Sequence, residues 1–433
     1  MKRFVRNLVD FVKRNLFIYI FQKKQQDSQR ILFNCDDELP DNLILKIADT
    51  QQEIEECLAL LHDSYVGSGF MIPDPSGLRV TVFHALPTTT TLCAKIDDKV
   101  VGTLSLIRDG PFGFPLQKIF DLREMREKGG VIAEASALAV HRTFRRHGGT
   151  ILFPLMKFMR EYCVTYFDVR HLVIAVNPRH IHMYESVLFF KRLQEQPVEN
   201  YDYVNGAPAV GATLDLQEAF AETGIYRKTY GSRPSSKNLH RYFLQRNLPN
   251  IQLPARRFFT TNDPVMTPEM LDYFFNIRTS HFKGLNDHDR ARLHMIYDLP
   301  EYHAVLPDFS QRASESRLRH HARFSFKCPG RFSYATPKSK RVEVSVEVVE
   351  ISRFGFVAQA ASQLVVDVWG EVEIRFGVHE ISRSSSCVVR DLGQRLYAFH
   401  VETPDMIWRK FMGAISKGST KNDLDNATQF LNL

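Results

Sequence analysis

The sequence lacks the features of membrane-spanning, secreted and zinc-binding proteins. No apolar run approaches the roughly 18 residues that cross a bilayer, so we expect no transmembrane helix. The longest apolar run near the N-terminus, residues 16–21, is shorter than the core of a signal peptide, and no small-residue cleavage site follows it. The 6 cysteines are scattered and include no C-x-x-C pair, which disfavours a zinc ribbon or a dithiol redox motif. These absences predict a cytoplasmic protein.

The net charge of +7 is concentrated in two places. Residues 1–30 have a net charge of +6 and residues 311–341 a net charge of +8, which leaves −7 for the remainder. Because the basic residues form two local patches and no long basic face, we expect no nucleic-acid partner, and a nucleic-acid binder is only the third hypothesis. The 433 residues exceed what one core supports and predict two or three folded units.

The first unit comprises residues 1–30. Apolar residues recur at a spacing of three to four over residues 1–24, with Lys and Arg between them, and this pattern predicts a basic amphipathic helix followed by a polar linker. Two interpretations remain open. The apolar face docks on the next domain, or the helix lies in the anionic inner surface of the cytoplasmic membrane and makes the protein peripheral.

Strands and helices alternate from about residue 42 to residue 216. The predicted strands are residues 43–47, 90–95, 100–108, 131–140 and 171–176. The predicted helices are residues 53–65, 116–128, 151–166 and 179–190. This alternation predicts an α/β fold with a mixed sheet and helices on both faces, and the pattern then becomes mainly helical over residues 231–308.

After about residue 316 the pattern changes to β. The predicted strands are residues 323–327, 342–349, 364–376, 385–389 and 396–401, and a helix is predicted at residues 404–415. Short strands separated by Gly, Pro and Ser predict a small all-β barrel or sandwich.

A strand ending at Val140 is followed by a short basic loop with Gly148 and Gly149, and then by an apolar helix that tolerates Pro154 only near its first turn. Glycines allow the backbone to approach a ligand, and a helix N-terminus attracts phosphate through its free N–H groups. The loop therefore predicts a phosphate-binding site. The alternative is a basic helix cap without a ligand.

This loop resembles the pyrophosphate-binding motif of GNAT acetyltransferases. Arg145 and Gly148 match the motif, and Thr150 replaces its last small residue. The resemblance implies that the acyl donor is bound by the following residues: Leu138, Ala139, Val140, Arg145, Arg146, Gly148, Gly149 and Thr150. The basic side chains of Arg142, Lys157 and Arg160 also suit a negatively charged donor.

A longer resemblance covers residues 41 to about 305. The G-T-L-S-L segment at Gly102, the D-G-P segment at Asp109 and the E-A-S segment at Glu134 resemble the middle of FeeM-type N-acyl amino acid synthases, relatives of the acyl-homoserine-lactone synthases. Ala137 stands where the latter family has an Arg. The resemblance implies an acyltransferase domain at residues 41–310 with a helical tail. Its donor would be acyl carrier protein phosphopantetheine or acyl-CoA, its acceptor an amino acid or similar amine, and it would need no metal.

Acyl transfer to an amine needs a base, an oxyanion donor and an acid for the departing thiol. Glu134 is the first candidate base and His141 the second, and Ser136 shares the motif of Glu134. The segment N-P-R-H-I-H-M-Y ends at Tyr184 and resembles the GNAT helix whose Tyr protonates the leaving thiolate. The alternative for Tyr184 is an ordinary aromatic of an amphipathic helix. Four further residues lie on a charged helix, where we expect a solvated face and no metal site: Asp287, His288, Asp289 and His294.

The β-rich segment carries two spaced motifs. R-H-H-A-R runs from Arg319 to Arg323, and E-I-S-R-F-G runs from Glu350 through Ser352 to Gly355. Together they resemble the signature of PilZ domains, with Glu350 in place of Asp or Asn. The resemblance implies a PilZ-like domain at residues 314–433 that binds cyclic di-GMP through these residues. The alternatives are a basic linker without a ligand and, for the whole chain, a catalytically inactive GNAT-like sensor controlled by cyclic di-GMP.

Overall fold

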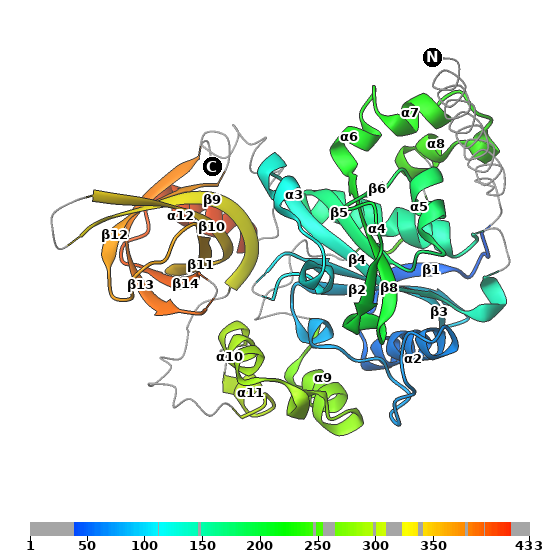
Figure 1. Cartoon of the computed structure of the whole chain (residues 1–433), viewed down its shortest axis with the longest axis horizontal. Coiled ribbons are helices and arrows are strands. Elements are labelled where there is room, and N and C mark those ends of the chain that lie inside the picture. Colours follow the sequence, from blue (N-terminus) through cyan, green and yellow to red (C-terminus); the bar gives the residue numbers. More distant parts are fainter. Residues whose placement is uncertain are drawn as a thin grey trace, which may run out of the picture.

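The computed structural model describes residues 39–110, 112–145, 149–245, 248–253, 265–297, 300–308, 323–336, 341–376, 380–393 and 395–416. Figure 1 shows a larger α/β unit and a smaller barrel. The N-terminal segment 1–30 and Arg319 lie outside the described residues, and what was predicted of them stays a prediction. Among the described helices, none has the length and hydrophobicity that a membrane-spanning segment requires.

The α/β unit is built on one mixed sheet. Its strands are β1 (Ile44–Ile47), β2 (Thr89–Ile96), β3 (Lys99–Arg108), β4 (Val131–Val140), β5 (Val169–Val176), β6 (Lys191–Arg192), β7 (Val198–Tyr201) and β8 (Ala207–Asp215). The order across the sheet is β1-β2-β3-β4-β5-β8-β6, with β7 paired to β8. β4 and β5 are parallel, and the other pairings in this sheet are antiparallel.

Helices cover both faces of the sheet. They are α2 (Gln51–Gly67), α3 (Arg123–Lys128), α4 (Leu152–Phe167), α5 (Ile181–Ser186), α6 (Leu216–Phe220), α7 (Ile225–Tyr230), α8 (Leu239–Leu244), α9 (Pro268–Asp272), α10 (Asp287–Ile296) and α11 (Pro300–His303). One apolar core joins the sheet to α4 and to α5–α8, and a second joins it to α2, α3 and α9–α11. Strand β3 is buried along nearly all of its length because both of its faces are covered.

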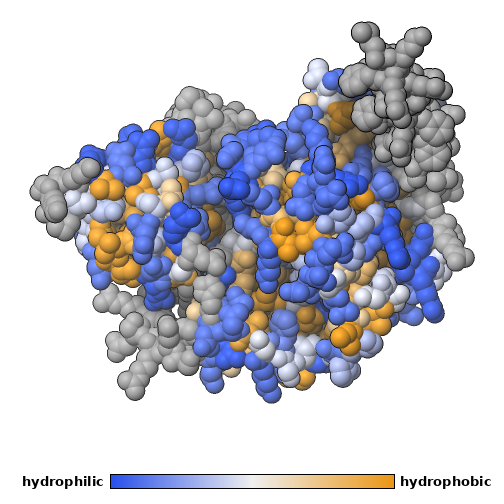
Figure 2. All heavy atoms as spheres, in the orientation of Figure 1, coloured by the Kyte–Doolittle hydropathy of each residue, from blue (hydrophilic) through white to orange (hydrophobic). Residues whose placement is uncertain are grey.

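The smaller unit is a closed antiparallel barrel. Its strands are β9 (Arg323–Ala335), β10 (Arg341–Ser352), β11 (Gly355–Ala360), β12 (Trp369–Arg375), β13 (Ile381–Asp391) and β14 (Leu396–Val401), and helix α12 (Met406–Ser416) follows. The barrel order is β10-β11-β14-β13-β12-β9. Helix α12 packs the fully buried Trp408 against Phe356 and Phe376. Figure 2 shows that the visible face of both units is mostly hydrophilic with scattered apolar patches.

The predicted fold class is confirmed: a GNAT-type mixed sheet with helices on both faces and a helical extension is followed by a small all-β barrel. Several predicted boundaries are wrong. The helix expected at residues 116–128 consists of a 3-10 turn at Pro115–Lys118 and the short helix α3. The strand expected from residue 364 begins at Trp369, and strands β6, β7, β8 and β11 were not predicted.

Candidate active site

The sheet opens between its two parallel strands. The pairing of β4 with β5 ends at Glu134 opposite Val173, although β4 continues to Val140 and β5 to Val176. Backbone groups of β4 that face β5 beyond this point are therefore outside the ladder. Such an opening leaves N–H groups available for a ligand.

A cavity of about 570 Å³ occupies this opening. Its lining includes Tyr201 and Ala137 from the core around α2, and Met156 and Tyr184 from the core around α4. The cavity thus passes through the sheet from one face to the other. A donor that enters on one face can meet an acceptor held on the other only at such a passage.

Glu134 lies at the passage and is 1% exposed. One of its carboxyl oxygens, Oε2, accepts a hydrogen bond from the backbone N–H of Leu116 at 3.1 Å. Burial raises the pKa of Glu134 to about 8, while this N–H group and the neighbouring Ser136 hydroxyl act in the opposite direction. A carboxyl with this pKa can accept a proton and release it near neutral pH.

Aromatic side chains surround Glu134 on the α2 side. The rings of Tyr201 and Tyr203 stack with centroids 5.8 Å apart, and Tyr65 lies near them on α2. Arg79 is 7% exposed and its guanidinium lies over the Tyr65 ring at 4.1 Å and the Tyr203 ring at 5.0 Å. Its Nη2 donates to the backbone oxygen of Tyr203 at 2.7 Å. Arg79 has no carboxylate partner among the described residues, and it lies behind the Tyr65 and Tyr203 rings that line the cavity, so a buried positive charge backs this end of the site.

Strand β4 is distorted beside Glu134. The register of β3 with β4 shifts between Thr103 and Ser105, which places an extra residue in β4. Ala137 lies at this bulge with a φ of 54°, a left-handed conformation that is uncommon for a residue other than glycine. The bulge turns the backbone of Leu138 and Ala139 toward the cavity that both residues line.

The residues around the N-terminus of α4 line one end of the cavity, and the exposed Arg145 is among them. No side chain caps this helix, and Gly149 precedes it with a φ of 93°. Arg145 lines the cavity and fixes the end of β4, since its Nε donates to the oxygen of Val140 at 2.7 Å and its Nη2 to the Ser64 hydroxyl at 2.9 Å. Thr150 follows at the start of the same turn. Arg146 and Gly148 lie outside the described residues.

Not all basic residues near this loop face the donor. Lys157 is 1% exposed, its Nζ donates to the Phe243 oxygen at 3.1 Å and it pairs with Glu161 at 2.6 Å, so the expectation that it contacts the donor is wrong. Arg160 lines the cavity two turns along α4 from that end. His141 is exposed and accepts a hydrogen bond from the N–H of Thr143, which makes it the cap of a 3-10 turn. Of the two candidate bases that the sequence offered, Glu134 lines the cavity and His141 does not.

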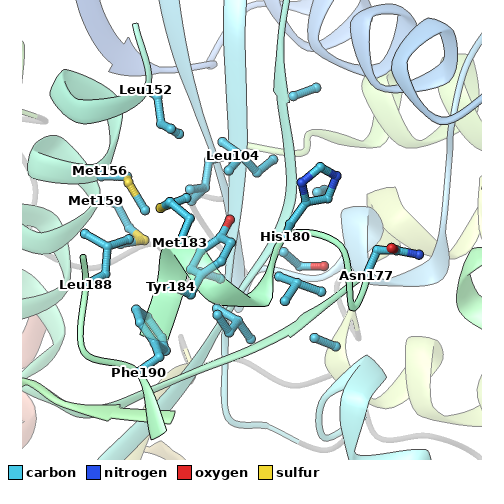
Figure 3. A pocket seen from close by; sticks show the side chains of 18 of the residues that line it. Leu104, Leu152, Met156, Met159, Asn177, His180, Met183, Tyr184, Leu188 and Phe190 are labelled. Atoms are coloured by element: carbon cyan, nitrogen blue, oxygen red, sulfur yellow. The ribbon is translucent and has the colours of Figure 1, made fainter. Parts of the chain in front are cut away.

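Tyr184 and the apolar part of the cavity lie on the α4 side. Figure 3 shows Met156 and Met159 to one side of Tyr184, with His180 and Asn177 to the other. Burial raises the pKa of the Tyr184 phenol to about 12, so the phenol carries its proton at neutral pH. The apolar wall is formed by Leu104, Leu152, Met156, Met159, Leu172, Met183, Leu188 and Phe190. Methionines adapt to chains of different shape.

The α/β unit that contains this cavity matches a known protein family. Residues 56–215 match the family N-acyl amino acid synthase FeeM. This segment is a FeeM-type synthase domain. The match falls in the α/β unit, and it places the chain among the N-acyltransferases.

Solved structures also resemble parts of the chain. FeeM from uncultured soil microbes is 25% identical, with 42% of this chain and 94% of that chain covered and a TM-score of 0.35. The CoA-dependent acyl-homoserine lactone synthase BjaI is 19% identical, with 49% and 93% covered and a TM-score of 0.34. The acyl-homoserine lactone synthase LasI is 13% identical, with 40% and 90% covered and a TM-score of 0.32. No curated protein matches the chain significantly.

The motif residues of the barrel lie outside the FeeM-type domain and share one end of the barrel. Strand pairing places Arg323 opposite Ser352, and Ser352 opposite Gly355. Arg323 Nη1 donates to Glu350 Oε2 at 3.1 Å, and both side chains are buried. The Ser352 hydroxyl donates to the Gly355 oxygen at 3.0 Å, and a Cβ at Gly355 would come within 2.5 Å of the Phe399 oxygen. Each of these residues therefore also serves the fold.

Sequence reasoning missed the tyrosine cluster and Arg79. Tyr65, Arg79 and Tyr203 come from distant parts of the chain, and no local spacing connects them. The predicted residues of α10 serve the helix itself: the backbone N–H of Asp289 donates to Asn286 Oδ1 at 2.9 Å and so caps the helix, and His294 Nε2 bonds the Pro307 oxygen at 2.9 Å. The described residues contain no group of three or more metal-ligating side chains.

Proposed function

We propose that the protein transfers a fatty acyl group from acyl carrier protein or acyl-CoA to the amine of an amino acid or similar amine. The observation that carries this proposal is the position of Glu134. It lies where the sheet opens, with an apolar tunnel on one side and a cluster of tyrosines with a buried guanidinium on the other.

Each catalytic requirement has a candidate group. Glu134 takes a proton from the acceptor ammonium, and the free amine attacks the thioester carbonyl. Backbone N–H groups of β4 near Leu138 to Val140 stabilise the oxyanion. As the new C–N bond forms and the C–S bond breaks, Tyr184 gives its proton to the departing thiolate, and the second proton that the attacking nitrogen must lose restores the Tyr184 phenol. Ser136 tunes the protonation of Glu134 and lines the same cavity.

The donor binds across the loop after Val140. Gly149 and the uncapped N-terminus of α4 suit a pantetheine or CoA phosphate, and the exposed Arg142 and Arg145 add positive charge. The acyl chain then extends along the apolar wall. Each buried methylene contributes about 0.8 kcal/mol, so the tunnel favours long chains.

Arg79 favours an acceptor that bears a carboxylate. Arg79 lies behind the Tyr65 and Tyr203 rings that line the cavity, and a positive charge in a low-dielectric place attracts a carboxylate that binds beside the amine. Glu134 does not supply this carboxylate, because its carboxyl accepts from the Leu116 N–H and forms no ion pair with Arg79 among the described residues. An amino acid meets this requirement better than a simple amine.

The test is synthesis by the purified full chain. Long-chain acyl carrier protein and acyl-CoA are each supplied with a panel of amino acids and matched amines, and the amide product is measured by mass spectrometry. We expect the Glu134→Gln substitution to lower the rate by about 10²-fold or more, the usual contribution of a general base. The matched control is Glu124→Gln, at an exposed residue of α3, and this variant should form the amide at the parental rate.

Two outcomes contradict the proposal. A folded Glu134→Gln variant that forms product at the parental rate removes Glu134 from the chemistry. A parent protein that binds the acyl donor but forms no amide with any acceptor supports the alternative of an inactive GNAT-like sensor.

We further propose that the barrel is a PilZ-type receptor for cyclic di-GMP that regulates the acyltransferase. Its support is the meeting of Arg323, Glu350, Ser352 and Gly355 at one end of the barrel. Arginines suit the two phosphates and the guanine faces of this ligand. Residues 1–24 are proposed to attach the protein to an anionic membrane surface.

A further inference from the structure

One cavity-lining side chain has no role in the chemistry described above. Leu152, Met156, Met159 and Arg160 form one face of α4 and line the cavity together. Eight residues of helix separate Leu152 from Arg160, which corresponds to about 12 Å along the axis at roughly 1.5 Å per residue. Arg160 therefore lies deep along this face of the cavity, on the side away from the phosphate-binding loop that precedes α4.

Aromatic side chains hold Arg160 in this position. Its guanidinium lies over the Phe220 ring at 4.4 Å, and the other face of that ring system stacks with Tyr226 at 4.1 Å between centroids. Phe220, Tyr226 and Phe243 all line the same cavity. The Tyr226 hydroxyl is already used, since it donates to the Leu188 oxygen at 3.0 Å.

One hydrogen-bond donor of the Arg160 guanidinium, its Nε atom, lacks an acceptor in the described part of the chain. The Nε atom of Arg160 is buried and has no hydrogen-bond partner among the described residues. The adjacent carboxylate, Glu161, pairs with Lys157 at 2.6 Å. Arg160 as a whole is half-buried, but an unpaired donor at its buried Nε atom is unfavourable and favours a ligand that brings an acceptor.

We propose that Arg160 recognises an oxygen acceptor at the far end of the acyl chain. The favoured donors then carry a terminal carboxylate or hydroxyl, and a chain that ends in a methyl group leaves the guanidinium unpaired. Arg160 is on this view a residue that determines acyl specificity. The inference rests on the proposed function for the identity of the tunnel, although it concerns binding and not the transfer step.

The kinetic experiment compares donors of equal length. Acyl-CoA substrates of graded length, ending in a methyl, hydroxyl or carboxylate group, are assayed with the full chain. We expect kcat/KM to favour the oxygenated donor of the best length by about ten- to a hundredfold, the usual range for a hydrogen bond to a charged group. Arg160→Leu should abolish or reverse this preference, and Arg160→Lys should keep part of it. Arg227→Leu, an exposed residue of α7, is the matched control.

A binding experiment separates this inference from the proposed function. Calorimetric titration of the parent and of Arg160→Leu with unreactive acyl-CoA thioethers, whose chains end in a methyl, hydroxyl or carboxylate group, requires no turnover. We expect Arg160→Leu to lose affinity for the analogues with an oxygenated end while keeping or gaining affinity for the methyl-terminated ones. Equal binding of both classes by the parent, or a preference that survives in a folded Arg160→Leu protein, overturns the inference even if the enzyme makes amides. Absence of amide product with the binding preference intact overturns only the proposed function.

Discussion

At the scale of single residues, the site depends on a carboxyl that the fold disfavours. Glu134 is buried, and burial raises its pKa from the ordinary value of 4.5 to about 8. The folded protein then binds more protons than the unfolded chain between these two pH values. Stability contributed by the neutral carboxyl is present below pH 4.5 and is lost as the pH rises through about 8.

Removing the charge should therefore stabilise the protein in a pH-dependent way. We expect Glu134→Gln to be about as stable as the parent near pH 4.5 and more stable by a few kcal/mol above pH 8, since each pKa unit corresponds to about 1.4 kcal/mol. Urea unfolding at both pH values measures the difference. Glu124→Gln should show no such trend, because this side chain is exposed. A difference that stays constant with pH would show that Glu134 is not held neutral.

At the scale of elements, the sequence predicted those strands whose residues form a clear apolar run. Strands β3 and β4 have long runs of Val, Ile, Leu and Ala and were predicted within one residue of their observed ends. Strand β8 has the sequence APAVGATLD. It was not predicted because Pro, Gly and Ala are not typical strand residues, whereas β-branched residues are. The tyrosine cluster could not be predicted, because packing alone brings Tyr65, Arg79 and Tyr203 together. Glu134, Tyr184 and the loop at Arg145 could be singled out from the sequence because each lies in a short motif.

The bulge in β4 gives a prediction about this element. Ala137 has a φ of 54°, so glycine relieves strain there but adds freedom to the unfolded chain. We expect Ala137→Gly to change stability by less than about 1 kcal/mol and to keep activity. Ala137→Val should cost more than about 1 kcal/mol and lower kcat, because a β-branched residue resists this conformation and would move the N–H groups of the bulge. Thermal unfolding and amide synthesis measure both. A Val variant with parental activity would separate the bulge from catalysis.

At the scale of the whole molecule, one strand of the barrel carries both the proposed nucleotide-binding residues and a contact with the α/β unit. Strand β10 carries Glu350 and Ser352 near its end. Glu347 lies on the same strand, three residues before Glu350. Glu347 lies 3.9 Å from Arg126 of α3, which pairs more closely with Asp109 at 2.7 Å. Such a partly exposed contact contributes little stability, so a ligand at the barrel can shift it readily.

We therefore expect cyclic di-GMP to bind the full chain and to change the rate of amide synthesis. Calorimetric titration and initial rates with and without the nucleotide measure the two effects.

Arg319→Ala should weaken binding about ten- to a hundredfold, the range for a hydrogen bond to a charged group. Arg323→Lys is the safer change at the second arginine, because Arg323→Ala would leave Glu350 buried and unpaired. The sequence alone predicts that Glu350→Asp tightens binding, but in the fold Glu350 is buried and already held by Arg323, so we expect the shorter side chain to weaken this pair and the barrel instead. Arg331→Ala, an exposed arginine of β9, should leave the affinity unchanged. A folded full chain that releases no heat at tens of micromolar nucleotide would leave the barrel as a protein-docking module.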